Sequence, residues 1–221
     1  MQLVQLKDYV LKPRGAGNGL SGIDFSLYKG DCYWIQSDSI DNAALFLKAR
    51  ATLAVPLKGT YWFRGSRIDL SDYRNSLFCK QQIGYISPDA ALISNRSIKE
   101  NLLFMRFFHE DSLSLALDDR TLELCRRFDI LDQLGQRPSE LHPRDIQNVV
   151  TVRELAKNPA ILLLESPEDF IDHSRYGLFN EVLSSLSQQE VALVFSSSDQ
   201  NFLKAFSCKK ILIRNSRLNV L

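Results

Sequence analysis

The sequence predicts an α/β layer protein with an N-terminal antiparallel β part and an inserted helical segment. Short apolar runs at Ala160–Leu164 and Val191–Phe195 alternate with segments of helical periodicity, a pattern typical of parallel strands covered by helices. From about Pro88 to Pro143 the chain instead carries mainly helical patterns. We therefore expect an α/β core that is interrupted by a helical insertion.

The composition narrows the class of protein. The chain has 221 residues, 27 Lys plus Arg against 26 Asp plus Glu, and a formal net charge of +1. This balance argues against a surface built to hold nucleic acid, and a 45% hydrophobic fraction argues against disorder. The apolar runs fall far short of the roughly 20 residues that a membrane span needs. We expect a cytoplasmic protein, or one that docks on a membrane protein from the cytoplasm.

The four cysteines, Cys32, Cys79, Cys125 and Cys208, stand far apart and form no CxxC pair. This spacing predicts free thiols in a reducing compartment. The three histidines lack the spacing of metal ligands, so no metal site is expected.

The chain opens with two alternating segments, Gln2–Leu11 and Ile23–Leu27, which predict strands. The glycine-rich segment Arg14–Gly19 lies between them. It fails the G-x-G-x-x-G pattern of dinucleotide sites because Leu20 stands where the third glycine belongs. We interpret it as a hairpin loop.

Parallel βαβ structure is predicted next. A strand at Cys32–Ile35 is followed by a polar loop and by a helix from Ala43 to about Leu53. Residues Tyr61–Ile68 predict another strand with a turn inside or beside it, and Ile83–Ile86 predicts a short strand closed by Ser87 and Pro88.

The middle and the end of the chain continue this alternation. Helical faces predict helices over Ser97–Phe108, Thr121–Leu131 and Pro143 to about Lys157. A further helix is expected at Tyr176–Ser187, before the second buried strand. Residues Lys210–Leu221 predict two short strands.

The order of these pieces resembles the nucleotide-binding subunit of ABC transporters over nearly the whole chain. The stretches that carry the resemblance are GDCYWI at Gly30–Ile35, IGYISPDAALISNRSIKENLLF at Ile83–Phe104, PSEL at Pro138–Leu141, VRELAKNPAILLLESPEDFID at Val152–Asp172 and VALVFSSSD at Val191–Asp199. They stand where that family has the strand before its P-loop, its Q-loop and E-N helix, its signature, its Walker B strand and D-loop, and its switch strand.

The resemblance implies a single P-loop NTPase-like domain, 1–221. Its core would be formed by residues 1–87 and 159–221, and its helical signature subdomain by residues 88–158. The phrase ALISNRSIKENL also resembles the lipid-trafficking, MCE-type branch of the family.

The segment that aligns with the family's P-loop, G-x-x-G-x-G-K-[ST], has lost its chemistry. We call it the degenerate P-loop, and it consists of Ser37, Asp38, Ser39, Ile40, Asp41, Asn42, Ala43 and Ala44. No glycine remains to curl the backbone around phosphate, Ala43 replaces the phosphate-neutralising lysine, and Ala44 cannot ligate magnesium. Asp38 and Asp41 add negative charge that repels a polyphosphate.

The other nucleotide-contacting positions are also altered. They are Ser87 for the Q-loop glutamine, His142, Pro143, Arg144 and Asp145 in the signature, Glu165 for the Walker B aspartate, Ser166 for the general base and Ser198 for the switch histidine. Pro143 removes an N–H donor, and Ser166 leaves no carboxylate to polarise water. The adenine-stacking aromatic aligns with Pro13, although Tyr9 stands nearby.

The resemblance therefore implies a pseudo-ATPase that docks on a membrane permease and supports transporter assembly or conformation, with little or no ATP hydrolysis and no cofactor. It would lie peripheral to the inner or plasma membrane, as a homodimer or as a heterodimer with another ABC ATPase subunit. The candidate partner-binding residues are Ser87, Phe104, Phe107 and Phe108, together with Asp172 of the D-loop.

Two alternatives remain open at this point. An atypical but active ATPase, powering transport with magnesium and ATP, would use Glu165 as its carboxylate and Arg144 or Lys48 for phosphate charge. The second is a soluble regulatory or nucleic-acid-associated ABC protein, whose basic clusters would be only short runs that are typical of solvated faces. We expect no nucleic-acid binding.

Overall fold

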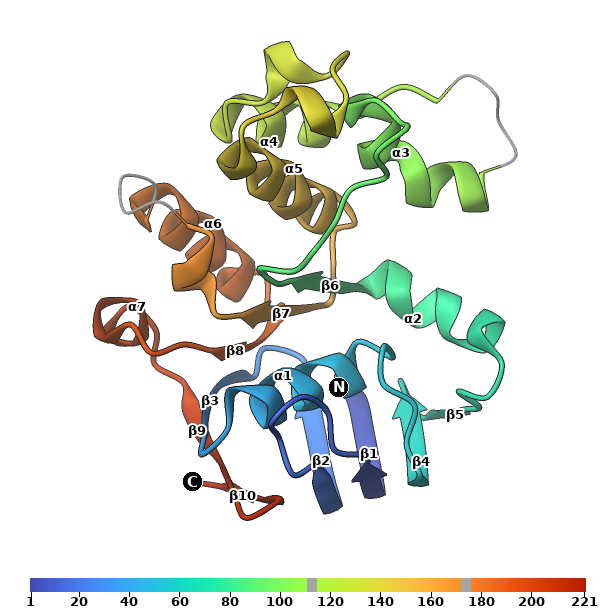
Figure 1. Cartoon of the computed structure of the whole chain (residues 1–221), viewed down its shortest axis with the longest axis vertical. Helices are drawn as coiled ribbons and strands as arrows, with labels where there is room; N and C mark the ends of the chain where they lie inside the picture. The colour runs from blue at the N-terminus through green and yellow to red at the C-terminus, as the bar shows by residue number, and fades with distance from the viewer. Residues whose placement is uncertain (111–114, 172–175) are drawn as a thin grey trace.

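The computed structural model describes residues 1–110, 115–171 and 176–221 (Figure 1). The strands are β1 (Gln2–Leu11), β2 (Leu20–Tyr28), β3 (Cys32–Ser37), β4 (Lys58–Phe63), β5 (Ser66–Ile68), β6 (Ile83–Ile86), β7 (Ile161–Glu165), β8 (Ala192–Ser196), β9 (Lys209–Arg214) and β10 (Arg217–Val220). The α-helices are α1 (Ile40–Arg50), α2 (Leu77–Gln82), α3 (Ile98–His109), α4 (Asp119–Arg127), α5 (Pro143–Ala156), α6 (Tyr176–Gln188) and α7 (Gln200–Lys204). The order confirms the predicted α/β class with a helical insertion.

The N-terminal part is an antiparallel sheet with the strand order β2-β1-β4-β5. Strands β1 and β2 form a hairpin whose last paired residues are Leu11 and Leu20. The glycine-rich segment Arg14–Gly19 is therefore the hairpin loop, as predicted. The turn inside Tyr61–Ile68 is also confirmed, because it separates β4 from β5.

The second sheet has the order β10-β9-β3-β8-β7-β6, and β3, β6, β7, β8 and β9 run parallel. Helix α1 lies between the two sheets (Figure 1). All five residues of β7 are buried, and they alternate between two cores: Leu163 packs in the core with the antiparallel sheet, while Leu162 and Leu164 pack in the core with the helices. This alternation explains the continuous apolar run of the sequence.

The inserted helices α3, α4 and α5 lie together on one side of the parallel sheet (Figure 1). Their buried apolar faces include Ile98 and Leu102 of α3, Cys125 of α4, and Val149 and Val150 of α5. Among the residues that the structure describes, no helix is both long and apolar enough to cross a bilayer.

Some predicted boundaries were wrong. Helix α1 begins at Ile40 rather than Ala43 because the Ser39 side chain caps its first turn, and it ends at Arg50 because Thr52 has a φ of 58°. Helices α2 and α7 were missed, since segments of five or six residues are too short to show an amphipathic period.

The prediction of four free thiols was wrong for one pair. Cys32 and Cys208 form a disulfide, with their Cα atoms 4.7 Å apart. Cys32 opens β3 and Cys208 immediately precedes β9, and these two strands are parallel neighbours. A sequence separation of 176 residues conceals that proximity. Cys79 and Cys125 are free and buried.

Candidate functional site

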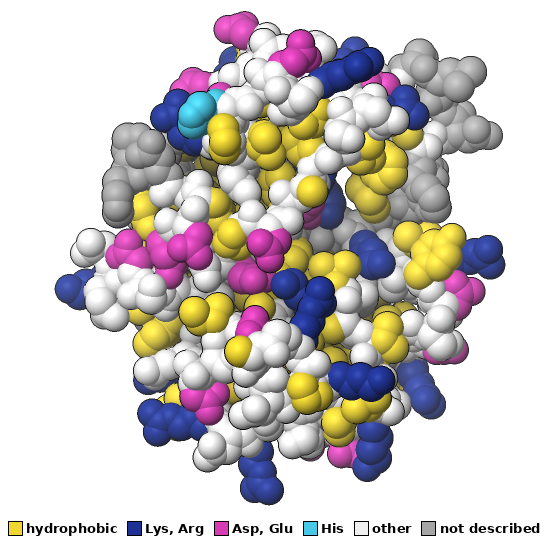
Figure 2. Space-filling model, in the orientation of Figure 1, with side chains coloured by type: hydrophobic (Ala, Val, Ile, Leu, Met, Phe, Trp, Pro, Cys, Tyr) yellow, Lys and Arg dark blue, Asp and Glu magenta, His cyan; other side chains and the backbone are white. Residues whose placement is uncertain are grey.

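The degenerate P-loop lies where parallel strands β3, β7 and β8 end. Ser196 at the end of β8 pairs with Ile35 of β3 on one side and with Glu165 of β7 on the other, so the three strand ends lie side by side. An open hollow of 440 Å³ lies at this edge, and its lining includes Ser37 and Ser166. Open α/β sheets bind ligands at the carboxyl ends of their strands. Figure 2 shows acidic side chains gathered near the ends of β7 and β8, which agrees with the acidic residues Glu168 and Asp169 that line the hollow.

The start of α1 is held by its own side chains. The Ser39 hydroxyl accepts a hydrogen bond from the Asn42 backbone N–H at 3.4 Å, and the Asn42 side-chain oxygen accepts one from the Gly19 N–H at 3.2 Å. Ala43 and Ala44 are buried, with exposed fractions of 4% and 7%. The position that would need a lysine therefore holds a methyl group packed in the core.

The two added carboxylates bind backbone groups of this chain. Asp41 Oδ2 accepts a hydrogen bond from the Ala16 N–H at 2.7 Å, and Asp38 Oδ2 accepts one from the Asn215 N–H at 2.9 Å. Ile40, between them, is 80% exposed. The degenerate P-loop thus contacts both the β1–β2 loop and the β9–β10 turn.

The end of β7 carries a buried carboxylate. Glu165 is 8% exposed and accepts a hydrogen bond from the Tyr85 hydroxyl, and its Oε2 atom lies 3.7 Å from Lys48 Nζ. Burial, followed by the hydrogen bond to Glu165, raises the pKa of Tyr85 well above its usual range. Glu165 and Lys48 are therefore paired with each other, rather than arranged to hold phosphate and metal.

Ser166 and Ser198 flank the same edge without forming a catalytic pair. Ser166 has a left-handed backbone, with φ of 45°, and Ser198 donates through its N–H and its hydroxyl to Glu168 Oε1, at 2.6 and 2.9 Å. The Ser197 hydroxyl donates to Glu168 Oε2 at 2.8 Å. Glu168 was missed at the sequence level; the signal was a carboxylate three residues after the end of a buried strand.

The residues present do not fit magnesium and ATP. Ala44 offers no oxygen ligand, Ser87 is buried at 3% exposure, and the Glu165 carboxylate is engaged by Tyr85 and Lys48. The degenerate P-loop also carries the carboxylates of Asp38 and Asp41, which repel the anionic phosphates of a nucleotide.

The signature positions begin α5. His142 is the N-cap residue, and its Nδ1 atom accepts a hydrogen bond from the Arg144 N–H at 3.4 Å; Pro143 occupies the first turn. Asp145 Oδ2 accepts a hydrogen bond from Gln133 Nε2 at 3.4 Å. No hydrogen bond or ion pair recorded within residues 1–110, 115–171 and 176–221 joins these positions to the degenerate P-loop.

The two candidate adenine-stacking positions differ in environment. Pro13 is exposed, whereas Tyr9 is fully buried in the core beneath the antiparallel sheet. Burial raises the pKa of Tyr9 above its usual range. Tyr9 is therefore a core residue, and its ring cannot stack on a base.

A second hollow, of 280 Å³, lies between the core and the inserted helices. Its lining joins Gln81 of α2, Leu102 and Met105 of α3, and Ala156 of α5. We call it the helical groove. Figure 2 shows hydrophobic side chains exposed over the helices in the same upper part of the molecule.

The predicted partner-binding residues are placed differently by the structure. Phe104 and Phe107 of α3 are exposed, at 47% and 42%. Ser87 is buried, so its side chain does not present a docking surface. The side chain of Phe108 and the whole of Asp172 lie outside the described residues.

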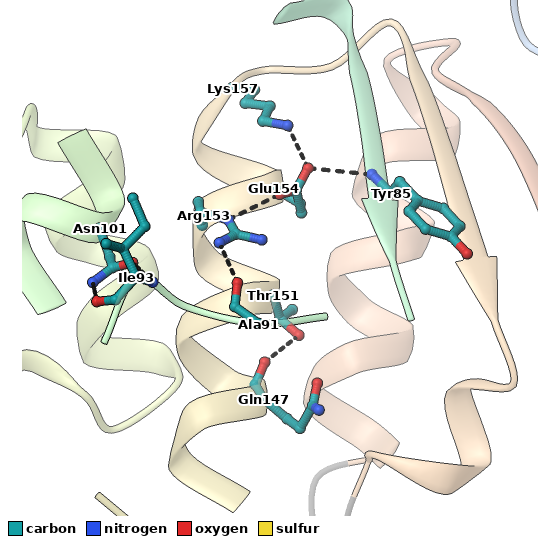
Figure 3. Close-up of polar contacts among 9 residues, drawn as sticks. All are labelled: Tyr85, Ala91, Ile93, Asn101, Gln147, Thr151, Arg153, Glu154 and Lys157. Carbon is teal, nitrogen blue, oxygen red and sulfur yellow. Dashed lines mark hydrogen bonds and ion pairs between the residues drawn. The ribbon is translucent and has the colours of Figure 1, made fainter. Parts of the chain in front are cut away.

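The linker between β6 and α3 is fastened to α5 (Figure 3). Gln147 Nε2 donates to the Pro88 carbonyl oxygen at 2.8 Å, and Arg153 Nη1 donates to the Ala91 carbonyl oxygen at 3.0 Å. The segment that replaces the Q-loop is thereby held against the helical insertion.

Glu154 of α5 joins the insertion to the parallel sheet (Figure 3). Its Oε2 atom accepts a hydrogen bond from the Tyr85 N–H at 3.2 Å, on edge strand β6, and its Oε1 atom accepts one from Arg153 Nε at 3.0 Å. Lys157 also pairs with this carboxylate, which is buried at 4% exposure. These donors offset the cost of burying the charge.

Comparisons with known proteins show which proteins this chain resembles in sequence. No protein-family model matches the chain. It is 27% identical over 190 residues to the lipoprotein-releasing system ATP-binding protein LolD 2 of Chlorobium chlorochromatii, covering 83% of this chain and 78% of that protein. It is 26% identical over 203 residues to the methionine import ATP-binding protein MetN 1 of Oceanobacillus iheyensis, covering 90% and 59%.

Solved structures share the fold. The dimeric, post-hydrolysis ATP-binding cassette MJ0796, bound to ADP and phosphate, matches with a TM-score of 0.83 at 18% identity, over 98% of this chain and 97% of that one. An ATP-binding subunit of an ABC transporter matches with a TM-score of 0.81 at 20% identity, over 99% and 90%. The predicted ABC ATPase fold is confirmed.

Proposed function

We propose that this chain, an ABC-type nucleotide-binding subunit by homology and fold, is a pseudo-ATPase that docks on a membrane permease. In this role it supports the assembly or conformation of a transporter with little or no ATP hydrolysis. It would lie at the membrane through the permease, as a homodimer or in a heterodimer with another ABC ATPase subunit.

The observation that carries the proposal is the content of the degenerate P-loop. Asp38 and Asp41 add carboxylates to the segment that aligns with a phosphate-binding loop, and the buried Ala43 supplies no cation. Repulsion between anions a few ångströms apart amounts to about 4 kcal/mol at the effective dielectric near a protein surface. Such a site disfavours ATP even with the fold preserved.

Docking through the helical groove is supported by exposed apolar surface. Leu102 and Met105 of α3 line the groove, and Phe104 and Phe107 leave further apolar surface exposed on another face of the same helix. An apolar groove rimmed by paired charges fits the apolar face of a short amphipathic helix. We therefore propose a cytoplasmic helix of the permease as the occupant.

Within permeases, we propose one that handles lipid-like cargo. The segment Ala91–Leu102 resembles the MCE-type lipid-trafficking branch. Several relatives at 26% to 28% identity are named as lipoprotein-releasing ATP-binding proteins. Both observations point to lipid-bearing cargo. The similarity itself is between ATP-binding subunits, and in the proposed complex the permease would handle the cargo.

The test measures ATP binding by calorimetry and phosphate release on the purified chain and on its complex with the permease. An ABC subunit with an intact P-loop serves as the positive control. We expect no micromolar binding and no turnover above background. Micromolar binding with turnover that the Glu165→Gln variant abolishes would overturn the proposal.

The active-ATPase alternative is favoured by one observation, namely that the relatives are named ATP-binding proteins. Against it, the carboxylate and one of the two cations that it needs are already paired, as Glu165 with Lys48. The calorimetric test separates the two functions directly.

A further inference from the structure

The glycine-rich β1–β2 loop lies directly on the first turn of α1. Asp41 accepts a hydrogen bond from the Ala16 N–H at 2.7 Å, and Asn42 accepts one from the Gly19 N–H at 3.2 Å. Asn42 is 2% exposed, so its side-chain oxygen has little access to water. Two successive side chains of the degenerate P-loop thus hold one loop of the antiparallel sheet.

The approach is close enough to require glycine in the loop. A Cβ atom on Gly15 would lie 2.6 Å from Asp41 Oδ2, and one on Gly17 would lie 2.7 Å from Asn42 Oδ1. Gly15 also has a φ of 58°, which favours glycine. The glycine cluster that matched no dinucleotide motif is therefore explained by its contact with α1.

A second segment reaches the same place from the other side. Asp38 accepts a hydrogen bond from the Asn215 N–H at 2.9 Å, in the turn between β9 and β10. The carbonyl oxygen of Ser216 in that turn accepts a hydrogen bond from the Ser21 N–H at 2.9 Å, at the start of β2. The turn thereby joins the degenerate P-loop to the antiparallel sheet.

In these contacts the degenerate P-loop supplies hydrogen-bond acceptors, whereas a phosphate-binding loop supplies donors. A phosphate-binding loop presents backbone N–H donors to an anionic ligand. Here the loop presents the side-chain oxygens of Asp38, Asp41 and Asn42, and the donors come from neighbouring segments of the same chain. A phosphate group, which in its ionised form has acceptors only, cannot replace any of these partners.

We propose that the loop Arg14–Gly19 and the Asn215–Ser216 turn form a latch on the degenerate P-loop. Their hydrogen bonds occupy the side chains of this segment and hold the two sheets together in the absence of nucleotide. The inference rests on the proposed loss of nucleotide binding and adds what took its place. A subunit latched in this way holds one conformation constitutively.

Hydrogen–deuterium exchange of the full chain tests the latch. In Asp41→Ala, the amide hydrogens of residues 14–19 are expected to exchange at least about tenfold faster, because a hydrogen bond to a charged acceptor is lost. Asp41→Asn keeps a side-chain acceptor and is expected to remain close to wild type. Adding magnesium and ATP to the wild-type chain is expected to leave the exchange of this loop unchanged.

Two further variants serve as a control and as an independent way to open the loop. Asp72→Ala removes a carboxylate that accepts a hydrogen bond from the Arg74 N–H at 2.9 Å, far along the chain, and should leave the β1–β2 loop unaffected. Gly17→Ala drives a methyl group against Asn42, and should open the loop with the degenerate P-loop unaltered even if Asp41→Ala does not fold.

Unchanged loop exchange in both Asp41→Ala and Gly17→Ala would overturn the latch while leaving the proposed pseudo-ATPase role intact. Accelerated exchange of the loop in wild-type chain on adding magnesium and ATP would also overturn it. ATP binding with turnover that Glu165→Gln abolishes, in a chain whose loop still responds to Asp41→Ala, would overturn the pseudo-ATPase role alone.

Discussion

Lys48 Nζ lies 3.7 Å from Glu165 Oε2, beneath the edge of the sheet where the degenerate P-loop begins its helix. The two side chains are 19% and 10% exposed, and Glu165 also accepts the Tyr85 hydroxyl hydrogen bond. An ammonium group of the chain itself thus neutralises the carboxylate at the end of β7. This pair is structural, and its removal should be measured as stability.

The Lys48→Met variant leaves a buried carboxylate without its cation. We expect it to lower the free energy of unfolding by about 3 kcal/mol, as measured by urea denaturation. Lys58→Met is the matched control, because Lys58 forms an exposed pair with Asp8 and should change little. Equal effects in the two variants would contradict a buried, structural pair. The double variant Lys48→Met with Glu165→Leu should recover most of the loss.

The sequence predicted most strands because buried parallel strands need continuous apolar residues, as at Ile161–Glu165, where every residue is buried. Alignment with a known motif also singled out residues 37–44, which the structure places between β3 and the first turn of α1. The sequence could not predict that Asp41 binds Ala16 or that Asp38 binds Asn215, since these contacts join segments 25 and 177 residues apart. Local patterns encode helices and strands, whereas such contacts depend on how the two sheets come together.

Arg50 is buried without a polar partner. It is fully enclosed, its guanidinium carbon lies 3.5 Å from the Phe46 ring centroid and 4.3 Å from that of Phe25, and none of its three side-chain nitrogens forms a hydrogen bond within the described residues. Contacts with two rings offset only part of the cost of burying this charge.

We therefore expect Arg50→Met to raise the free energy of unfolding by about 1 kcal/mol, and the Tm by about 2–4 °C. Burial lowers the pKa of Arg50, the direction expected for a cation that is enclosed without a polar partner. Arg64→Met, at an exposed arginine, is the control, and a destabilised Arg50→Met would contradict the argument.

The cysteines should divide into two reactivity classes, a disulfide pair and a buried free pair, that thiol counting can separate. Native oxidised protein should show almost no reactive thiol, because Cys79 and Cys125 are fully buried and burial raises the pKa of each to about 11. Unfolding without reductant should expose two thiols, and unfolding with reductant should expose all four cysteines. A count of four without reductant would contradict the Cys32–Cys208 disulfide.

Buried tyrosines couple the stability of the chain to alkaline pH. Burial raises the pKa of Tyr176 to about 12, and burial raises the pKa of Tyr9, Tyr61 and Tyr85 further above the ordinary value of 10.0. The folded chain therefore retains protons that the unfolded chain loses, so this stability is fully present below pH 10 and is lost as pH rises through and above 12. Urea midpoints measured at increasing pH should fall from about pH 10 upward. Midpoints that stay constant past pH 12 would contradict the burial of these phenols.

Docking through the exposed face of α3 can be separated from folding by surface substitution. Phe104→Gln with Phe107→Gln exchanges two exposed rings for residues of good helix propensity, and should leave the free energy of unfolding within about 0.5 kcal/mol of wild type. The same variant should lower at least tenfold the amount of permease recovered by co-purification, because a few apolar anchors dominate the affinity of an interface. Val55→Gln, which changes a 63% exposed residue between α1 and β4, is the matched control. Equal permease recovery with the Phe104/Phe107 variant and with Val55→Gln would place the docking surface elsewhere.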